Sequence, residues 1–260
     1  MNARLLIITA ATSARRALAE RGGLVVTAGF YAAVIAVLGS LWRAAANAHG
    51  GHLAGYTGTQ LTWYIAATEA ATVSLNLRLI EDIGDDIASG TIVVELLRPA
   101  SVLAVRLAAE IGRALPRLAL CLVTAAAVDG AITRSLPGPG VAAAAVVALL
   151  LAMLCNLAAQ HAFASAAFWV RDARSTWFLY QKLVFVVGGM LLPLEVLPGP
   201  LEHIAKLLPF MAMAYAPGRL ASGHVEPVLL LVQLLWVAGL LGVAAACFTA
   251  GERRLQVVGG

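Results

Sequence analysis

The stretch VAAAAVVALLLAMLCNLAAQHAFASAAFWV, residues 141–170, contains no Asp, Glu, Lys or Arg. A helix needs about 20 apolar residues, each rising about 1.5 Å, to cross the hydrocarbon core of a bilayer. This stretch therefore predicts a transmembrane helix. Because it is longer than a bilayer requires, we expect the helix to tilt or to project into the cytoplasm.

Five further apolar stretches accompany this one, and charged or proline-rich segments separate them. They cover residues 24–42, 61–80, 118–132, 177–192 and 228–248. The third can begin near Ala114, with Pro116 kinking its start, and the fifth is short because Pro193 follows it. We therefore predict an all-α polytopic membrane protein with six transmembrane helices.

Composition favours a membrane protein over a soluble one. Hydrophobic residues make up 61% of the chain and charged residues 12%, and the mean hydropathy is +0.86. Soluble domains are about a quarter charged, because their surfaces face water. We therefore expect a lipid bilayer as the solvent. The three cysteines lie inside apolar stretches and show no disulfide or zinc spacing.

The distribution of basic residues predicts the orientation in the membrane. With the N-terminus inside, the outer segments hold Arg43, Arg134, Lys206 and Arg219, and the other fourteen Lys and Arg residues are cytoplasmic. This asymmetry follows the positive-inside rule. It predicts a multi-pass protein of the plasma (inner) membrane with both termini in the cytoplasm. The net charge of +4 does not indicate a nucleic-acid partner, because the basic residues punctuate apolar stretches and form no basic face.

Residues 1–23 predict an interfacial helix on the cytoplasmic side rather than a signal peptide. The apolar run after Arg4 is soon diluted by threonines and closed by Arg15 and Arg16. Arg4, Thr12, Arg16 and Glu20 fall on one side of such a helix. The expected domains are this helix, a transmembrane domain at 24–250 and a cytoplasmic tail at 251–260.

A folded cytoplasmic segment is expected after the second span, with its coupling region at residues 81–113. It carries most of the acids of the chain, together with the apolar run Ile92, Val93, Val94, Leu96 and Leu97. We expect a short helix, a turn at Gly90 and a second helix that leads into the third span. Apolar runs are rare in solvated loops, so the segment is interpreted as a docking surface.

The outer segment at residues 191–225 is apolar but interrupted by prolines. Pro193, Pro198, Pro200, Pro209 and Pro217 divide it into pieces that are too short to span a bilayer. Such segments enter the bilayer and return, lined by protein. We predict a re-entrant helical hairpin between spans five and six, with Pro193, Glu195, Pro198, Pro209 and Phe210 at an outer gate.

No catalytic motif is visible in the sequence. There is no H-E-x-x-H or G-x-S-x-G pattern and no cluster of metal ligands. A phosphate-binding loop is also missing, because neither Lys182 nor Lys206 follows a glycine. The chain is therefore not expected to be an enzyme or to hold a cofactor or metal, and nucleotide-driven work requires another chain.

Glu69 lies near the middle of the second predicted span, where an ionised carboxylate is costly unless paired, hydrated or protonated. Helical spacing places Thr62, Glu69 and Asn76 on one seam. The seam either lines a translocation path or clamps neighbouring helices by hydrogen bonds, and the sequence leaves both interpretations open. Asn156, Gln160 and His161 form a similar polar patch in the fourth span.

Two motifs resemble ABC-2 type transport permeases. IASGTI at 87–92 followed by ELLRP at 95–99 resembles the cytoplasmic segment after the second span. PLEVLP at 193–198, followed by LLPF at 207–210 and YAP at 215–217, is similar to the outer re-entrant region of that family. With the six-span plan, the resemblance covers nearly the whole chain.

The resemblance implies a membrane subunit that forms a homodimer or heterodimer and binds two cytoplasmic ATP-binding subunits, which hold ATP and Mg. It also implies a coupling helix, to which Asp85, Gly90, Thr91, Leu97, Arg98 and Pro99 would belong, and a lesser contact through Arg171, Asp172 and Arg174. Similarity is greatest to the drug- and antibiotic-export branch. Family members export drugs, lipids, polysaccharides and peptides.

Three hypotheses follow. The first is an exporter permease driven by a separate ATPase, with its path lined by Thr62, Glu69, Asn76, Asn156 and His161. The second is a proton-coupled secondary carrier that uses Glu69, although no internal repeat is visible. The third is a membrane enzyme that acts on lipid, for which the sequence shows no acid, base or metal set.

Overall fold

The computed structural model describes residues 3–97, 100–170 and 173–258, and it is helical apart from one short β-hairpin in these ranges. The first half contains α1 (Ala3–Ala19), α2 (Arg21–Ala48), β1 (His52–Leu53), β2 (Tyr56–Thr57), α3 (Gly58–Val73), α4 (Leu79–Ala88), α5 (Ile92–Leu96) and α6 (Val102–Thr133). The second half contains α7 (Pro139–Ala164), η1 (Ser165–Phe168), α8 (Ala173–Lys182), η2 (Leu183–Val187), η3 (Leu194–Val196), α9 (Gly199–Leu207), η4 (Pro209–Ala212), α10 (Tyr215–Ala221) and α11 (Pro227–Val258).

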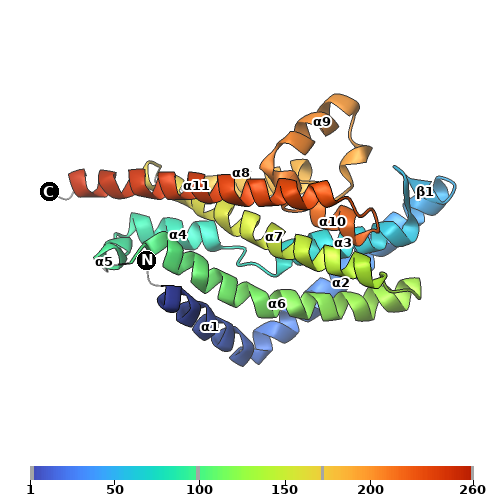
Figure 1. The fold of residues 1–260 in the computed structure, drawn as a ribbon, viewed down its shortest axis with the longest axis horizontal. Helices are drawn as coiled ribbons and strands as arrows, with labels where there is room; N and C mark the ends of the chain where they lie inside the picture. The colour runs from blue at the N-terminus through green and yellow to red at the C-terminus, as the bar shows by residue number, and fades with distance from the viewer. Residues whose placement is uncertain (1–2, 98–99, 171–172, 259–260) are drawn as a thin grey trace.

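Within the described ranges, four helices are long and apolar enough to cross a membrane. They are Arg21–Ala48, Val102–Thr133, Pro139–Phe168 and Pro227–Arg254. These helices contain the predicted first, third and sixth spans and the predicted fourth span up to Phe168. Figure 1 shows α6, α7 and α11 running along the long axis of the molecule, with the start of α1, α5 and the end of α11 toward one end and the β-hairpin at the other. The all-α membrane fold predicted from the sequence is confirmed.

The helices of the other two predicted spans end earlier than the sequence suggested. α3 ends at Val73, although apolar residues continue to Ile80. The side chain of Asn76 accepts a hydrogen bond from the Arg78 amide at 3.0 Å and donates to Asp82 at 3.0 Å. These two bonds fix a turn between α3 and α4, because they offer the backbone an alternative to the helical ladder. α8 likewise continues only into the short π-helix η2, which is followed by Gly188 and by Gly189 at φ +76°.

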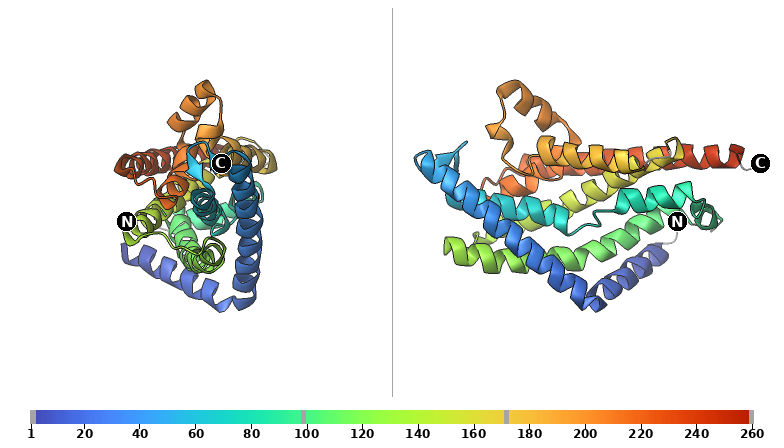
Figure 2. Two further views of the ribbon diagram at one scale, coloured as in Figure 1. Left: turned by 90° about the vertical axis from the view of Figure 1, so that its right-hand side faces the viewer. Right: turned by 180° about the vertical axis from the view of Figure 1, so that it is seen from behind.

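α3 is the central helix of the bundle. Its side chains from Leu61 to Ala71 are nearly all buried, and it packs against α2, α6, α7 and α10. Four alanines, Ala66, Ala67, Ala70 and Ala71, let the neighbouring helices approach closely, as small residues do in membrane bundles. Figure 2 shows α2 and α11 on opposite sides of this centre. Most groups on α3 are therefore screened by protein.

α1 packs along the first half of α6. The contact is close at Gly112 of α6, because an added Cβ there would lie 2.1 Å from the carbonyl oxygen of Ala10. Thr12 and Arg16 line a cavity that α1 shares with α4 and α6. The predicted N-terminal helix is thus present, and it is held on the bundle through a glycine that the sequence did not single out.

Replacing Gly112 with alanine is expected to move α1 away from α6, because the new methyl group would overlap backbone that cannot rotate aside. We expect faster hydrogen–deuterium exchange across residues 3–19 and a loss of about 1–3 kcal/mol in the free energy of unfolding. Gly242→Ala in α11 is the matched control, since nothing lies within 4 Å of its added Cβ. Equal exchange in the two variants would contradict the prediction.

Candidate functional site

A cavity of about 180 Å³, which we call the Glu69 cavity, lies between α2, α3, α7 and α8. Glu69 of α3 is only 5% exposed and lines it, together with Asn156 and Gln160 of α7. Tyr180 of α8 closes one side, where its hydroxyl donates to the Asn156 side-chain oxygen at 2.6 Å. Among the described residues Glu69 has no hydrogen-bond or ion-pair partner.

The structure thus brings together two of the five predicted path residues, Glu69 and Asn156. Thr62 instead packs on Gly39 of α2 and donates to the Gly58 carbonyl at 2.9 Å. Asn76 lies in the turn after α3, so the predicted seam ends before it. His161 is fully buried and faces α11, with Nδ1 2.7 Å from the Leu157 carbonyl oxygen and its ring 6.4 Å from that of Phe248.

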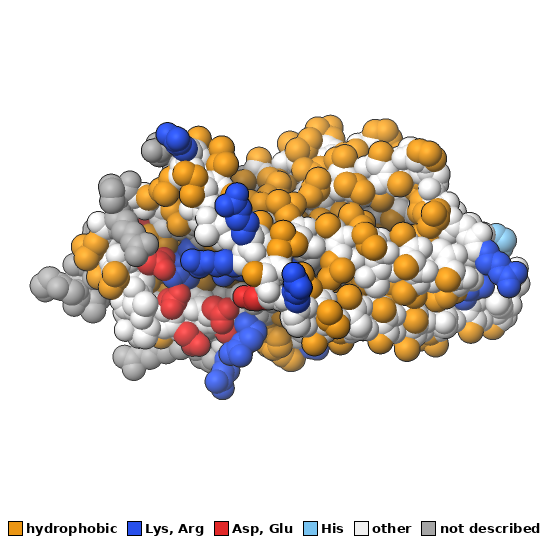
Figure 3. Space-filling view, turned by 90° about the horizontal axis from the view of Figure 1, so that it is seen from below, with side chains coloured by type: hydrophobic (Ala, Val, Ile, Leu, Met, Phe, Trp, Pro, Cys, Tyr) orange, Lys and Arg blue, Asp and Glu red, His pale blue; other side chains and the backbone are white. Residues whose placement is uncertain are grey.

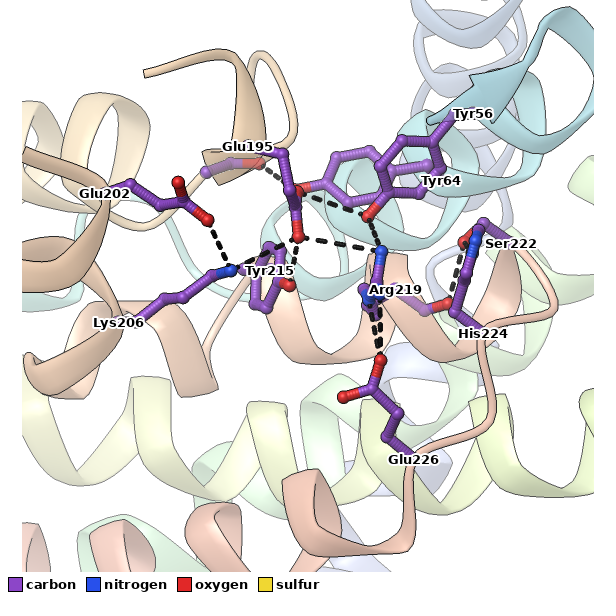
Figure 4. Close-up of polar contacts among 11 residues, drawn as sticks. Tyr56, Tyr64, Glu195, Glu202, Lys206, Tyr215, Arg219, Ser222, His224 and Glu226 are labelled. Carbon is purple, nitrogen blue, oxygen red and sulfur yellow. Dashed lines mark hydrogen bonds and ion pairs between the residues drawn. The ribbon is translucent and has the colours of Figure 1, made fainter. Parts of the chain in front are cut away.

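A second cluster, the outer network, consists of Tyr56, Glu195, Lys206, Tyr215 and Arg219 (Figure 4). The Glu195 carboxylate accepts hydrogen bonds from the two tyrosine hydroxyls and pairs with Lys206 at 3.4 Å and Arg219 at 3.6 Å. Arg219 also donates to the Tyr56 hydroxyl at 2.8 Å. One carboxylate therefore joins β2, η3, α9 and α10.

Two further carboxylates, Glu202 and Glu226, pair with the basic residues of this network, and Glu226 connects it to the start of α11. Arg219 pairs with Glu226, just before α11, at 2.8 Å, and Lys206 pairs with Glu202 at 2.7 Å. Glu195 and Arg219 are partly buried, with side chains 19% exposed, so these contacts are less screened than surface pairs. The outer segment is consequently fastened to the bundle at several points.

Prolines set the short helices of this outer segment. Pro198 precedes α9 and Pro209 opens η4, in keeping with the preference of proline for helix starts. Pro193 precedes η3, which carries Glu195, and Phe210 is buried beside Gly188. Figure 1 shows α9 standing off from the bundle while α10 lies within it. The proposed gate residues therefore belong to one connected region.

The third cluster lies at the opposite end, where α4 and α5 form a helical hairpin around Gly90, whose φ is +77°. Arg106 of α6 holds both helices: its guanidinium donates to Glu95 of α5 at 2.8 and 3.0 Å and to Asp86 of α4 at 2.6 Å. Bidentate arginine–carboxylate contacts fix geometry as well as adding energy. The hairpin is therefore attached firmly to the start of α6.

The exposed edge of α5 is apolar. Val93, Val94 and Leu97, which we call the coupling surface, are exposed, and Leu97 is 82% exposed. Asp85 and Thr91 are exposed beside it, and Arg174 is exposed at the start of α8. Arg98, Pro99, Arg171 and Asp172 lie outside the described residues.

A cavity of about 680 Å³ lies behind the coupling surface, between α1, α4 and α6. Its charged lining residues are Arg16, Asp82, Asp86, Glu95, Arg106, Glu110 and Arg113. Figure 3 shows acidic and basic side chains gathered at this end, whereas hydrophobic side chains cover the middle of the molecule. This distribution is what a bilayer around the middle requires.

Several residues with notable burial or contacts were not singled out from the sequence. Asp129 of α6 is fully buried, and neither carboxylate oxygen has a partner among the described residues. A single acid inside the predicted span at 118–132 is the signal that could have singled it out. Tyr180, Arg106 and Arg219 were not recognised because their partners lie far away in the sequence.

The outer network predicts an acid-sensitive stability. Burial alone would raise the pKa of Glu195, but the hydrogen bond from Tyr215 and the charges of Lys206 and Arg219 hold that pKa below its ordinary value. A carboxylate with a lowered pKa contributes stability above its unfolded pKa of about 4.3, and the contribution disappears as the pH falls through the folded-state pKa.

We therefore expect the melting temperature of Glu195→Gln to lie below that of the wild type at about pH 7, and the difference to shrink below about pH 4. Both proteins are measured by thermal unfolding in the same detergent across this range. Since other carboxylates titrate in both proteins, the difference between them is the informative quantity. A difference that stays constant from pH 7 to pH 3 would show that Glu195 is not held ionised by this network.

The long apolar helices and the charged ends define a polytopic α-helical membrane protein. The family model of ABC-2 family transporter proteins matches residues 32–259, and the chain belongs to this family. No curated protein matches the chain. Membership identifies a multi-pass permease subunit of an ABC transporter, a non-catalytic membrane component whose partner is an ABC ATP-binding subunit.

Proposed function

We propose that this chain is the membrane subunit of an ATP-driven exporter and that the coupling surface docks on its ATP-binding subunit. The observation that carries the proposal is the exposed apolar edge of α5, which the bidentate contact of Arg106 holds in place. Exposed apolar side chains on a rigid element are typical of a binding site for a protein partner. Asp85 and Thr91 add polar contacts at its border.

A displacement of α5 would reach the transmembrane helices through direct contacts. Arg106 links α5 and α4 to α6. α4 also packs against α7 and α8, which form two sides of the Glu69 cavity. The turn at residues 74–78 joins α4 to α3, which carries Glu69 itself. Closure of the ATP-binding subunits would therefore change the cavity from three sides at once.

The proposed orientation follows from the charges. The end with α5 and both termini holds most arginines and is assigned to the cytoplasm by the positive-inside rule. The outer network then lies on the far side, as a re-entrant gate above the path. Two permease copies, identical or paralogous, would form the complete translocation unit with two ATP-binding subunits, and drugs or lipids are the proposed cargo.

The test is purification of the tagged chain from its native membranes in mild detergent. We expect a second polypeptide that carries a G-x-x-x-x-G-K-[ST] phosphate loop, in a 1:1 ratio, and ATP hydrolysis by the complex. Purified complex in lipid vesicles is expected to move cargo only when ATP is supplied. If a pH gradient drives cargo transport by the chain alone, without ATP, the chain is a proton-coupled carrier. The family match gives that alternative no support.

A further inference from the structure

Glu69 is the one charged group among the described residues that line its cavity. Neither a basic side chain nor a hydrogen-bond donor of the described residues pairs with its carboxylate, and no Lys or Arg faces the space from α2, α7 or α8. An unpaired acid in the membrane interior is costly, and such groups mark ion or substrate sites. A cation that enters the cavity would supply the missing partner.

The walls of the cavity are suited to an organic cation. Four aromatic side chains line it: Phe30, Trp177, Tyr180 and Phe185. The Trp177 ring nitrogen donates to the Leu77 carbonyl at 2.7 Å, and the Tyr180 hydroxyl donates to Asn156 at 2.6 Å. Because the protein itself occupies these polar atoms, the two rings offer a ligand mainly their aromatic surface. Aromatic rings attract alkylammonium groups by cation–π interaction.

An inorganic cation fits the cavity less well. Sodium, magnesium and calcium are bound by several oxygen ligands, whereas Glu69 supplies the single carboxylate among the described lining residues. The side-chain oxygen of Asn156 already accepts the Tyr180 hydroxyl. Thr72, Gln160 and Gln181 add only uncharged oxygens, and the rest of the lining is mostly apolar, so Glu69 would have to replace a hydration shell with a single charge. The chemistry therefore favours a cation that carries its charge on carbon-substituted nitrogen.

We propose that the Glu69 cavity binds the ammonium group of an amphiphilic organic cation, which is a substrate of the transporter. This inference rests on the proposed function as a permease and names the class of its cargo. The cavity, at about 180 Å³, is smaller than the roughly 300–1,000 Å³ of sites that enclose a whole drug. It accommodates the cationic head, and the apolar remainder passes the exposed rim residues Phe30 and Leu77 into the lipid.

The probe is benzyltrimethylammonium, and its uncharged carbon isostere is neopentylbenzene. Binding of each radiolabelled compound is measured by equilibrium dialysis against the full-length chain in nanodiscs of zwitterionic lipid, with empty nanodiscs as the blank. We expect the wild type to bind the cation and not the isostere. Glu69→Gln should weaken cation binding by at least about tenfold, because it removes the charge at nearly constant shape.

Asp129→Asn is the matched control, since it neutralises another buried acid of the bundle that does not line the cavity. It should leave cation binding unchanged. Trp177→Leu removes one aromatic wall at a partly exposed position and should weaken binding severalfold, which provides a second variant if Glu69→Gln does not fold.

Unchanged cation binding by a folded Glu69→Gln variant, or equal binding of the isostere by the wild type, would overturn the inference. Binding needs no ATP-binding subunit, so its failure is distinguishable from failure of the proposed function. A chain that recruits the ATPase without binding the cation refutes the cargo class alone. A chain that binds the cation without recruiting any ATPase refutes the proposed energy source alone.

Discussion

Aspartate at both Val94 and Leu97 is expected to release the ATP-binding subunit while leaving the permease folded. These side chains are 61% and 82% exposed, so the two substitutions remove little packing and should change the free energy of unfolding by less than about 1 kcal/mol. In a docked complex the same positions would bury two unpaired charges. Each such burial costs several kcal/mol, and together they should weaken association by at least about 100-fold.

The measurement is recovery of the ATP-binding subunit with tagged permease, together with the ATPase rate of the purified complex. Leu136→Asp combined with Val225→Asp is the matched control, because it adds two charges at exposed apolar positions near the opposite end of the molecule. Its ATPase recovery should equal that of the wild type. Undiminished recovery with the Val94 and Leu97 variant would show that the ATP-binding subunit does not dock on the coupling surface.

The helical hairpin of α4 and α5 was predictable because its signals are local. A glycine between two helical segments predicts a turn with positive φ, and Gly90 adopts φ +77°. The apolar run after it predicted a folded segment, and α5 begins at Ile92. The role of Arg106 was not predictable, since its contact with Asp86 joins residues twenty positions apart on different helices.

The end of α3 shows where hydrophobicity misleads. Leu75, Leu77 and Leu79 continue the apolar run, and a hydropathy window therefore extends the span to Ile80. The structure ends the helix because the short side chain of Asn76 competes for backbone and acidic partners nearby. That competition depends on Asp82 of the following helix, which a window over one span does not weigh.

The sequence identifies two residues of the Glu69 cavity but does not show that they lie together. A charge inside an apolar span singles out Glu69 without any structure, and Asn156 is noticed as a polar residue inside another apolar span. Their proximity depends on the packing of α7 and α8 beside α3. The position of Tyr180 in the cavity wall depends on the same packing. Asp129 carried the same signal as Glu69, and only the structure shows that it does not line this cavity.

The substitution Gly218→Val is expected to lower the stability of the outer region strongly. Gly218 of α10 faces α3, where an added Cβ would lie 2.7 Å from Cε2 of Tyr64 and 2.8 Å from Cγ2 of Thr68. Valine adds two further methyl groups at the same point. Overpacking of this kind costs about 1–3 kcal/mol, and we expect the upper end of that range.

Neither neighbour can move aside easily. Tyr64 is fully buried, and its hydroxyl donates to the Gly189 carbonyl at 2.6 Å. Thr68 donates to the Met190 carbonyl at 3.1 Å, so the same stretch after η2 holds both side chains. The same stretch also contacts α10, because the Gly188 carbonyl accepts a hydrogen bond from the Tyr215 amide at 2.9 Å. The strain at position 218 therefore has no free direction in which to relax.

The measurement is thermal unfolding of the purified chain, in which 3 kcal/mol corresponds to a melting temperature about 6–12 °C lower. Gly199→Val is the matched control, because nothing lies within 4 Å of its added Cβ in α9. Since Arg219 follows Gly218 directly, displacement of α10 should also separate Arg219 from Glu195, and hydrogen exchange should rise across residues 194–221. Equal melting temperatures for the two valine variants would mean that α10 is not seated on α3, and the outer network would then lose the support on which its proposed role as a gate depends.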